Sequence, residues 1–410
     1  MTDLASRAAA LLGIAVFLGI AWALSEHRRR FPWRIAAWAL AIQLGLALLL
    51  LRSPASRAFF VGVSDAVGAL IGFTEAGTQF VFGSLRQGGF SFALDVLPII
   101  LVMGSLFGVL YHWRVVQLLV RALARGLSRT MGISAAEGLS VVADVFVGMV
   151  EAPLLIRPYL ARMTRSELFT VMTAGMATIA GSVLVAYARM LGGGDYAGHL
   201  VAASFLAAPA AVLVAKVMVP ETGVPETSTA TAATVPVTSV NTIDAAAAGA
   251  IAGLRLAASV GALLLAFVAL LTMANAGLGH AGDWIGVPGL TLQRVLGWLF
   301  APVALLLGIA PAEAQTVGAL LGVKTVLNEL LAYRDLGTLI EAGGISTRGA
   351  VISSYALCGF ANFGSLAILL GGVGAMVPER RPEIARLGLR AILSGTLASL
   401  MTGSVAAVLL

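Results

Sequence analysis

The chain has 410 residues, of which 59% are hydrophobic and only 11% are charged. Soluble domains carry about 25% charged residues, so this composition excludes a soluble globular protein and indicates one that crosses a membrane several times. The net charge of +6 does not point to nucleic acid as a partner, because the arginines are confined to short segments between apolar runs. We assign these arginines to orientation in the membrane.

The apolar runs predict an all-α polytopic membrane protein with about eight transmembrane helices, since each run can cross about 30 Å of hydrocarbon. The uncharged runs span residues 8–24, 35–51, 168–187, 256–273, 351–377 and 391–410, and a further span covers about 94–112. Segment 113–129, "WRVVQLLVRALARGLSR", carries arginines at helical spacing opposite leucine and valine, which predicts an interfacial helix. With every arginine cluster in the cytoplasm, both termini lie outside.

A linker is predicted over residues 221–243, which are rich in Thr, Pro and Ser and have no helical periodicity. We expect this linker to be cytoplasmic and to divide the chain into four parts. These are the N-terminal spans and an interfacial helix in 1–90, a first repeat in 91–220, the linker, and a further span with a second repeat in 244–410.

The two halves are predicted to be inverted repeats. Each has a glutamate in a short interrupted apolar stretch, "GMVEAPLL" with Glu151 and "TVLNELLAY" with Glu329. In each half a long apolar span broken by Gly and small polar residues follows about thirty residues later, and paired interrupted segments of this kind are typical of transporters. We therefore predict re-entrant helical hairpins around 135–160 and 312–340, the first entering from the cytoplasm and the second from outside.

Asp144 and Glu151 lie in a stretch otherwise apolar enough for a membrane core. Each carboxylate at that depth costs about 2.5–3.5 kcal/mol, so both need a polar surrounding. Gly148 and Pro153 flank Glu151 and predict two half-helices that meet at a non-helical tip, which is tolerated only beside a cavity or other protein. Two structural alternatives stay open: Glu151 pairs with Lys324 only for stability, or Asp144 has a capping or water-bridging role.

The second half offers polar groups for a small ligand. Glu329 and Asn328 lie in the predicted hairpin, and Asn362 and Ser365 are three positions apart, so they share one face of a span. Together these side chains supply both donors and acceptors to hydroxyl groups. Two alternatives apply to nearby residues: ordinary core packing for Phe360 and Cys358, and back-bonding within a helix for Thr178 and Ser182.

Four segments closely resemble the signature segments of concentrative nucleoside transporters, in the same order and spacing. They are "VFVGMVEAPLLIRPYL", "GMATIAGSVLVAYA", "GVKTVLNELLAY" and "ALCGFANFGSLAILLGG". The resemblance runs from about residue 9 to the C-terminus. It implies a homotrimer in the bacterial inner membrane, with two re-entrant hairpins and an elevator-like transport domain per protomer. The implied activity is nucleoside uptake driven by Na⁺, or by H⁺ in some bacterial members, with no cofactor.

The resemblance also implies roles for individual residues. It assigns the nucleobase to the first hairpin and to two apolar walls, at Gly148, Met149, Val150, Glu151, Val183 and Phe360. It assigns the ribose to Glu329, Asn362 and Ser365. The cation site falls on Asp144, Val147, Thr178 and Ile179, through two side-chain oxygens and backbone carbonyls. Supporting positions are Ser182, Lys324 and Asn328.

Two departures from the family pattern bear on specificity. Relatives commonly have Gln followed by Thr or Ser where this chain has Met149 and Val150, and the Gly–Met pair with Ser182–Val183 is more similar to purine-preferring members, where a flexible Met fits a larger base. Sodium-coupled relatives commonly have Asn where this chain has Asp144. A buried carboxylate either tightens Na⁺ binding or carries a proton itself, so both couplings stay open, with H⁺ slightly favoured.

Buried carboxylates in a membrane protein are also compatible with two other classes of function. An uncoupled channel or facilitator would use the same binding groups without accumulation. A membrane-embedded transferase would use two carboxylates as acid and base. The sequence has one cysteine, Cys358, no metal-ligand spacing among its four histidines, no phosphate loop and no nucleophile motif. We therefore expect a transporter and not an enzyme.

Overall fold

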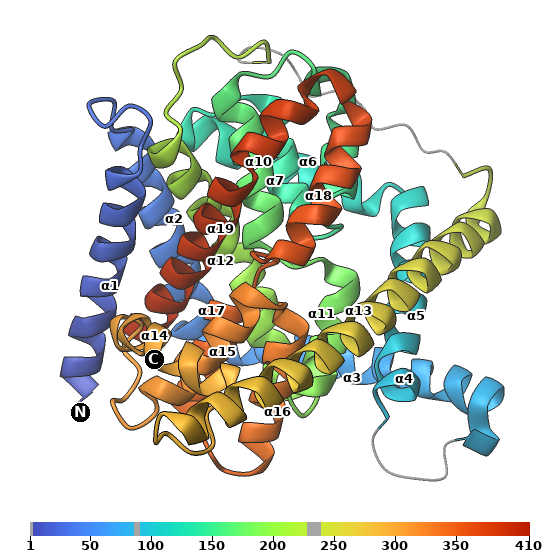
Figure 1. The fold of residues 1–410 in the computed structure, drawn as a ribbon. Coiled ribbons are helices and arrows are strands. Elements are labelled where there is room, and N and C mark those ends of the chain that lie inside the picture. Colours follow the sequence, from blue (N-terminus) through green and yellow to red (C-terminus); the bar gives the residue numbers. More distant parts are fainter. Residues whose placement is uncertain (1–2, 86–90, 228–238) are drawn as a thin grey trace.

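The computed structural model describes residues 3–85, 91–227 and 239–410, and every regular element within them is helical. Eight helical stretches in this part of the chain are long and apolar enough to cross a membrane. The prediction of an all-α polytopic membrane protein is therefore confirmed. Figure 1 shows most helices in one bundle, with α4 and α5 to one side of it and the long α13 running diagonally from α5 across the bundle.

The first third of the chain forms three long helices and a set of shorter ones. They are α1 (Asp3–Ala23), α2 (Trp33–Leu51), α3 (Pro54–Phe82), η1 (Gly83–Leu85), α4 (Phe92–Asp95), α5 (Leu97–His112) and α6 (Val115–Met131). Helix α3 was not among the predicted spans, because Asp65 and Glu75 interrupt its apolar run. Helix α6 is amphipathic as predicted, with Val116, Val120 and Leu127 buried on one face.

The centre of the molecule is built from helices on both sides of the linker. It holds α7 (Ala135–Asp144), α8 (Glu151–Leu155), α9 (Arg157–Leu160), α10 (Arg165–Ala177), α11 (Gly181–Met190), α12 (Gly194–Met218), α15 (Ala314–Val326), α16 (Glu329–Glu341), α17 (Thr347–Leu357), α18 (Phe363–Met376), η2 (Pro378–Arg380) and α19 (Arg381–Leu409). Helix α12 is 89% buried over its most apolar stretch, and α19 is 78% buried. The C-terminal helix therefore packs inside the bundle and the two halves share one core.

Two predicted spans are interrupted by non-helical backbone. Residues 178–180 separate α10 from α11, and residues 358–362 separate α17 from α18. The two breaks meet, because a Cβ placed on Gly359 would lie 2.8 Å from the Ala177 carbonyl oxygen, and Gly359 has a φ of +143° that favours glycine. Polar backbone at this depth is thus enclosed by protein, as such breaks require.

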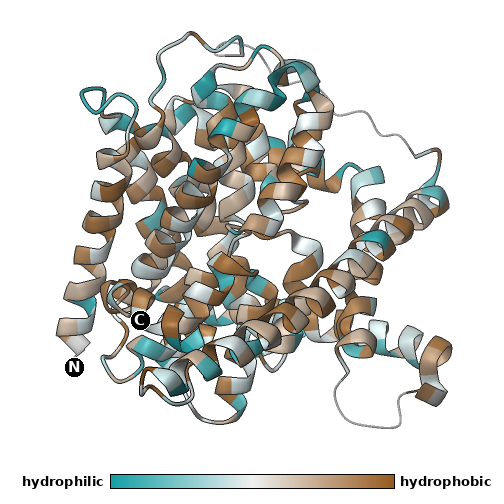
Figure 2. Ribbon diagram, in the orientation of Figure 1, coloured by the Kyte–Doolittle hydropathy of each residue, from teal (hydrophilic) through white to brown (hydrophobic). Residues whose placement is uncertain are grey.

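At the edge of the bundle, α13 (Thr242–Trp284) is 43 residues long and packs closely against α5. Glycines at the crossing allow the two backbones to approach, since a Cβ on Gly104 would lie 2.7 Å from the Gly249 carbonyl oxygen. Only 11% of the apolar stretch of α13 is buried. Figure 2 shows hydrophobic residues along most of α13 and α1, and a hydrophilic loop between α1 and α2. Helix α14 (Leu292–Leu306) packs mainly on α15.

The α5–α13 crossing should be sensitive to added side-chain volume. Replacing Gly253 by Leu is expected to destabilise the protein by about 1–3 kcal/mol, because its Cβ would lie 2.8 Å from the Leu101 Cα atom. Gly277→Leu on the same helix is the matched control, since nothing lies within 4 Å of that position. Thermal unfolding in detergent measures both. Equal stability of the two variants would contradict this account of the crossing.

The sequence has four arginine clusters, within residues 28–34, 114–129, 157–165 and 380–390, and contacts between them place them at one end of the molecule. Arg165 and Arg390 both pair with Glu26 in the α1–α2 loop, and the hydrogen bonds from Arg165 hold the pKa of Glu26 below its usual range. Arg34 donates to the carbonyls at the end of α6, and Arg380 donates to the Met163 carbonyl. At the opposite end Arg7 donates to the Leu410 carbonyl, so the two termini lie together.

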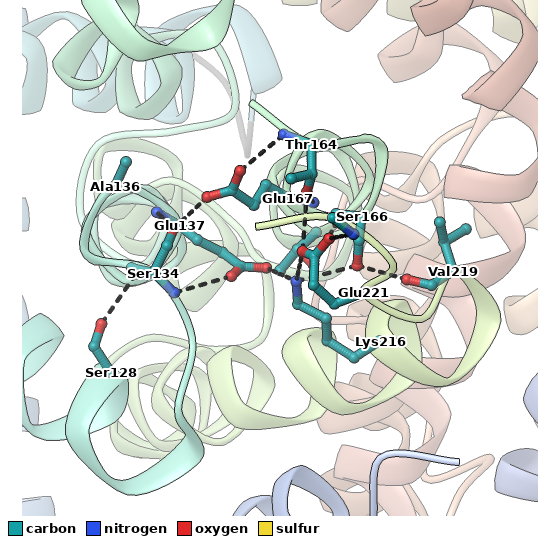
Figure 3. A network of polar contacts seen from close by, with 12 residues as sticks. Ser128, Ser134, Ala136, Glu137, Thr164, Ser166, Glu167, Lys216, Val219 and Glu221 are labelled. Carbon is teal, nitrogen blue, oxygen red and sulfur yellow. Dashed lines mark hydrogen bonds and ion pairs between the residues drawn. The ribbon is translucent and has the colours of Figure 1, made fainter. Parts of the chain in front are cut away.

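Polar side chains connect the N-terminal ends of α7 and α10 to each other and to α12 (Figure 3). Helices α7 and α10 each begin with a capping box, formed by Ser134 with Glu137 and by Thr164 with Glu167. The Ser134 hydroxyl also donates to Glu167 at 2.5 Å, and the Lys216 ammonium lies 2.8 Å from Glu137. Because Glu137 and Glu167 are almost fully buried, these bonds satisfy charges that would otherwise be very costly.

Ser134 contributes to this network twice, as the N-cap of α7 and as a donor to Glu167. Ser134→Ala is expected to lower the free energy of unfolding by about 2 kcal/mol. The control is Ser53→Ala, because Ser53 occupies the N-cap of α3 without making a side-chain capping bond, and its effect should stay within about 0.5 kcal/mol. Chemical unfolding in detergent compares the two.

Part of the predicted linker lies outside the described residues, which stop at 227 and resume at 239. The preceding segment is bound to the first repeat. Thr227 is buried, and its backbone and side-chain oxygens accept hydrogen bonds from the N–H groups of Ala135 and Ala136 at the start of α7. Helix α13 begins at Thr242, so the last two linker residues are helical.

Candidate functional site

The segment between α7 and α8 is the non-helical tip predicted around Glu151. Gly148 has a φ of +127°, and a Cβ there would lie 2.9 Å from the Glu151 Oε2 atom, so glycine is required for the tip to close over the carboxylate. The Glu151 carboxylate takes hydrogen bonds from the backbone at Val150 and Glu151. Its side chain is exposed, which leaves it accessible to a ligand.

The two residues before Glu151 point at different neighbours. Met149 is buried against α10, where a Cβ on Gly175 would lie 2.8 Å from the Met149 Cβ atom. Val150 packs on α18, where a Cβ on Gly372 would lie 2.7 Å from the Val150 Cγ1 atom. The tip therefore lies between α10, the first half of one broken span, and α18, the second half of the other.

Asp144 ends α7 and is fully buried. Neither of its carboxylate oxygens has a hydrogen-bond partner among the described residues, and no basic side chain pairs with it there. The alternative of a capping role is therefore not supported. The charge of Glu151, also negative, acts on Asp144. A buried carboxylate in this state is unfavourable unless a cation or a proton accompanies it.

Oxygen atoms from the α10–α11 break lie close to Asp144. The Thr178 Oγ1 atom is 3.5 Å from the Asp144 carbonyl oxygen and donates its proton to the Ala174 carbonyl at 2.9 Å. Its lone pairs are thus free to face a cation. The tip touches the same break, because the Gly181 N–H donates to the Phe146 carbonyl. A carboxylate, a hydroxyl and unwound carbonyls form the donor set that binds Na⁺ or H⁺ in broken-helix transporters.

In the second repeat, Glu329 begins α16 and is 6% exposed. Its Oε2 atom accepts a hydrogen bond from the Asn362 side chain at 2.8 Å, and its Oε1 atom accepts one from the Tyr187 hydroxyl at 2.7 Å. Asn328 is the N-cap of the same helix, where its side-chain oxygen accepts from the Leu331 N–H. The structure therefore brings Glu329 and Asn362 together.

The relation between Asn362 and Ser365 differs from the prediction. The two residues do not share a helix face, because the span is broken before Phe363 and Asn362 is the N-cap of α18. Its Oδ1 atom accepts from the Ser365 N–H at 2.8 Å. This capping bond fixes the amide so that its NH₂ group faces Glu329.

Two tyrosines near the site were not singled out by the sequence analysis. Tyr187 stacks on Tyr333 with 4.7 Å between ring centroids, and the Tyr333 hydroxyl donates to the Ser354 carbonyl. Each follows an alanine in its repeat, in "VLVAY" and "NELLAY". A tyrosine inside an apolar run must find a partner for its hydroxyl, and that signal could have drawn attention to Tyr187.

Lys324 does not form the stabilising ion pair with Glu151 that was one of the sequence-based alternatives. Its ammonium is fully buried, donates to the Ala356 carbonyl at 2.9 Å and interacts electrostatically with Glu329. Pairing of Lys324 with Glu151 is therefore not observed. The remaining predicted residues lie at or beside the breaks: Val147, Ile179, Ser182, Val183 and Phe360, with Ile179 and Val183 buried.

Three models of protein families match consecutive parts of the chain. A model described as the N-terminus of Na⁺-dependent nucleoside transporters matches residues 12–85, a nucleoside-recognition gate model matches 93–194, and the corresponding C-terminal model matches 199–407. The chain belongs to the concentrative nucleoside transporter family. The resemblance seen in the four sequence segments is thereby confirmed, and the transferase alternative is excluded.

The relatives of this nucleoside transporter include bacterial and mammalian proteins. It is 43% identical to an uncharacterized transporter, YutK, of Bacillus subtilis, covering 97% of this chain and 98% of that one. It is 38% identical to the nucleoside permease NupC of Helicobacter pylori, covering 97% and 96%. Sodium/nucleoside cotransporter 1 of Mus musculus is 40% identical, and there the match covers 97% of this chain but 63% of the mouse protein.

Solved structures share the fold over the whole length. The transporter CNTnw in an inward-facing substrate-bound state superposes with a TM-score of 0.92 at 42% identity, covering 98% of both chains. A substituted form of CNTnw in an outward-facing state gives the same TM-score. The fold described above is therefore that of a membrane transporter whose similar structures include both inward- and outward-facing states.

Proposed function

We propose that this family member is a cation-coupled symporter that takes up nucleosides, with purine nucleosides favoured. The observation that carries the coupling is Asp144, which is buried without a partner beside the oxygens of the α10–α11 break. A cation or proton bound there compensates its charge, so binding of the ion and closure of the tip around Glu151 become one event. The ion site comprises Asp144 and Thr178 side chains with carbonyls at Val147 and Ile179.

The nucleoside is proposed to lie between the two helix pairs. Glu151 and the backbone at Gly148 meet the base, with Met149, Val150, Val183 and Phe360 as its apolar surroundings. Glu329, Asn362 and Ser365 meet the ribose, because an acceptor-only carboxylate and a bifunctional amide suit neighbouring hydroxyl groups. This arrangement is supported by the contact of Val150 with α18, whose N-terminus carries Asn362 and reaches Glu329.

The assembly and orientation are part of the same proposal. We infer a homotrimer in the inner membrane that moves by an elevator-type alternating access, with α7–α8 and α15–α16 as re-entrant hairpins. Both termini face outside and the linker is cytoplasmic, which is supported by the arginine clusters at the end opposite Arg7 and Leu410. We also propose that the chain is divided at the boundaries predicted from the sequence, into 1–90, 91–220, 221–243 and 244–410.

Uptake of labelled adenosine into proteoliposomes, with a Na⁺ gradient or a pH gradient imposed separately, tests the coupling. We expect accumulation above the external concentration under one of the two gradients. The family description favours Na⁺, whereas the carboxylate of Asp144 is also able to carry H⁺. Equilibration without accumulation under both gradients would favour the uncoupled facilitator.

The apolar pair Met149–Val150 is expected to set the preference for purines. Met149→Gln together with Val150→Thr restores an amide and a hydroxyl, each able to add about 1 kcal/mol to a pyrimidine edge. The double variant should therefore raise the affinity for uridine relative to inosine by about 30-fold. Competition against labelled adenosine measures the ratio. Uridine competing as well as inosine in the unsubstituted protein would refute the purine preference.

A further inference from the structure

The two repeats differ in how the charges of their acidic side chains are balanced. The first repeat holds Asp144 and Glu151, and no basic side chain pairs with either among the described residues. The second repeat holds Glu329 together with Lys324, whose ammonium acts on it. The acidic side chains of the first repeat thus lack a basic side chain to balance them, whereas Lys324 provides a positive charge for Glu329 in the second.

Asp144 and Lys324 occupy corresponding places in the two repeats. Asp144 is the last residue of α7, and Lys324 lies in the last turn of α15, the first helix of the other pair. Each lies against the break of its repeat's span. The Asp144 carbonyl oxygen is 3.5 Å from Thr178 at the end of α10, and the Lys324 Nζ atom is 2.9 Å from the Ala356 carbonyl oxygen in the last turn of α17.

The surroundings of the Lys324 ammonium are those of a cation site. It is fully buried, and the Ala356 carbonyl is its one hydrogen-bond partner in the described chain. The carbonyl end of a helix favours positive charge, and α17 ends one residue later at Leu357. The carboxylate of Glu329, which accepts bonds from Tyr187 and Asn362, acts on this ammonium electrostatically without a direct ion pair between the two side chains.

We propose that Lys324 is a tethered cation that fills, in the second repeat, the place that a mobile cation takes beside Asp144 in the first. The positive charge that acts on Glu329, an acceptor for a ligand hydroxyl, is then present whether or not a coupling ion is bound. The part about the mobile cation rests on the proposed function. With one site filled by the chain itself, the transporter has one exchangeable cation site and moves one cation per nucleoside.

A stability cycle tests the tethered charge without requiring transport. Lys324→Met, Glu329→Gln and the double variant are purified in detergent and their Tm values are compared with that of the unsubstituted protein. We expect each single variant to lose Tm, because it leaves a buried charge uncompensated, and the double variant to recover at least half of the larger loss. If Lys324→Met lowers the Tm equally in the unsubstituted protein and in the Glu329→Gln variant, Lys324 serves only to cap a helix, and the proposal is overturned.

Restoration of the charge gives a second, independent readout. Lys324→Arg should keep most of the Tm, whereas Lys324→Ala should lose it and regain part of it in ethylammonium chloride but not in ethanol. No response of Lys324→Ala to ethylammonium, with Lys324→Arg as unstable as Lys324→Ala, would overturn the proposal. A measured flux of two cations per nucleoside in the unsubstituted protein would overturn the single-cation part. Absence of nucleoside uptake with a positive stability cycle would instead refute the proposed function alone.

Discussion

Asp144→Ala is expected to end concentrative uptake under either ion gradient and to abolish stabilisation of the protein by the coupling cation. A ligand that binds the folded state at 100 times its Kd stabilises that state by about 2.7 kcal/mol. The Ala variant should gain nothing, because the only buried carboxylate without a partner in the described chain has been removed. Thermal unfolding across a series of Na⁺ concentrations and across pH measures the loss.

Asp144→Asn then separates the two cations. An amide oxygen still offers a ligand to Na⁺ but no site for a proton. Dependence on Na⁺ should therefore survive in Asp144→Asn with weaker affinity if Na⁺ is the coupling ion, and dependence on pH should vanish if H⁺ is. In cation-free buffer the Asn variant is expected to be at least as stable as the unsubstituted protein, because a neutral group replaces a buried charge.

Asp195→Ala is the matched control for Asp144→Ala, since Asp195 is an exposed acidic residue in the first turn of α12. It should keep both the uptake and the cation-dependent shift. Accumulation by Asp144→Ala equal to that by Asp195→Ala would contradict the ion site and with it the coupling mechanism.

Long apolar runs made most of the membrane helices predictable, but not those with charges inside them. Helix α3 was missed because Asp65 and Glu75 lie within it, and α13 extends well beyond its uncharged run, which ends at Arg255 on one side. Hydropathy averaged over a window does not separate a charge that faces neighbouring protein from one that faces lipid. That distinction depends on which helix packs alongside.

The positions of the helix breaks were only partly predictable. Gly and small polar residues marked both broken spans, yet similar residues continue through α18, which stays helical from Phe363 to Met376. What fixes the break at Gly359 is its contact with the end of α10, more than 180 residues earlier in the chain. For the same reason the partner of Lys324 could not be read from the sequence, because it depends on how α15 meets α17 and α16.

Glu329→Gln is expected to weaken nucleoside binding by at least about 100-fold, equivalent to about 2.7 kcal/mol. The Glu329 carboxylate accepts hydrogen bonds on both oxygens, from Tyr187 and from Asn362. A glutamine in its place turns one of these acceptors into a donor, so one of the two partners faces another donor at a cost of about 1–3 kcal/mol. It also leaves the buried Lys324 ammonium without a counter-charge, which adds to the loss.

Two comparisons separate this effect from a general loss of stability. Tyr187→Phe removes one donor and keeps the charge, so its binding loss should be about 5-fold, as for a single hydrogen bond of about 1 kcal/mol. Glu341→Gln, at the exposed end of the same helix α16, should leave binding unchanged. Binding is measured by titration of the purified protein with adenosine. Equal affinities in Glu329→Gln and Glu341→Gln would place the ribose elsewhere, since the carboxylate that accepts from Tyr187 and Asn362 cannot lose its charge without altering a ligand bound to it.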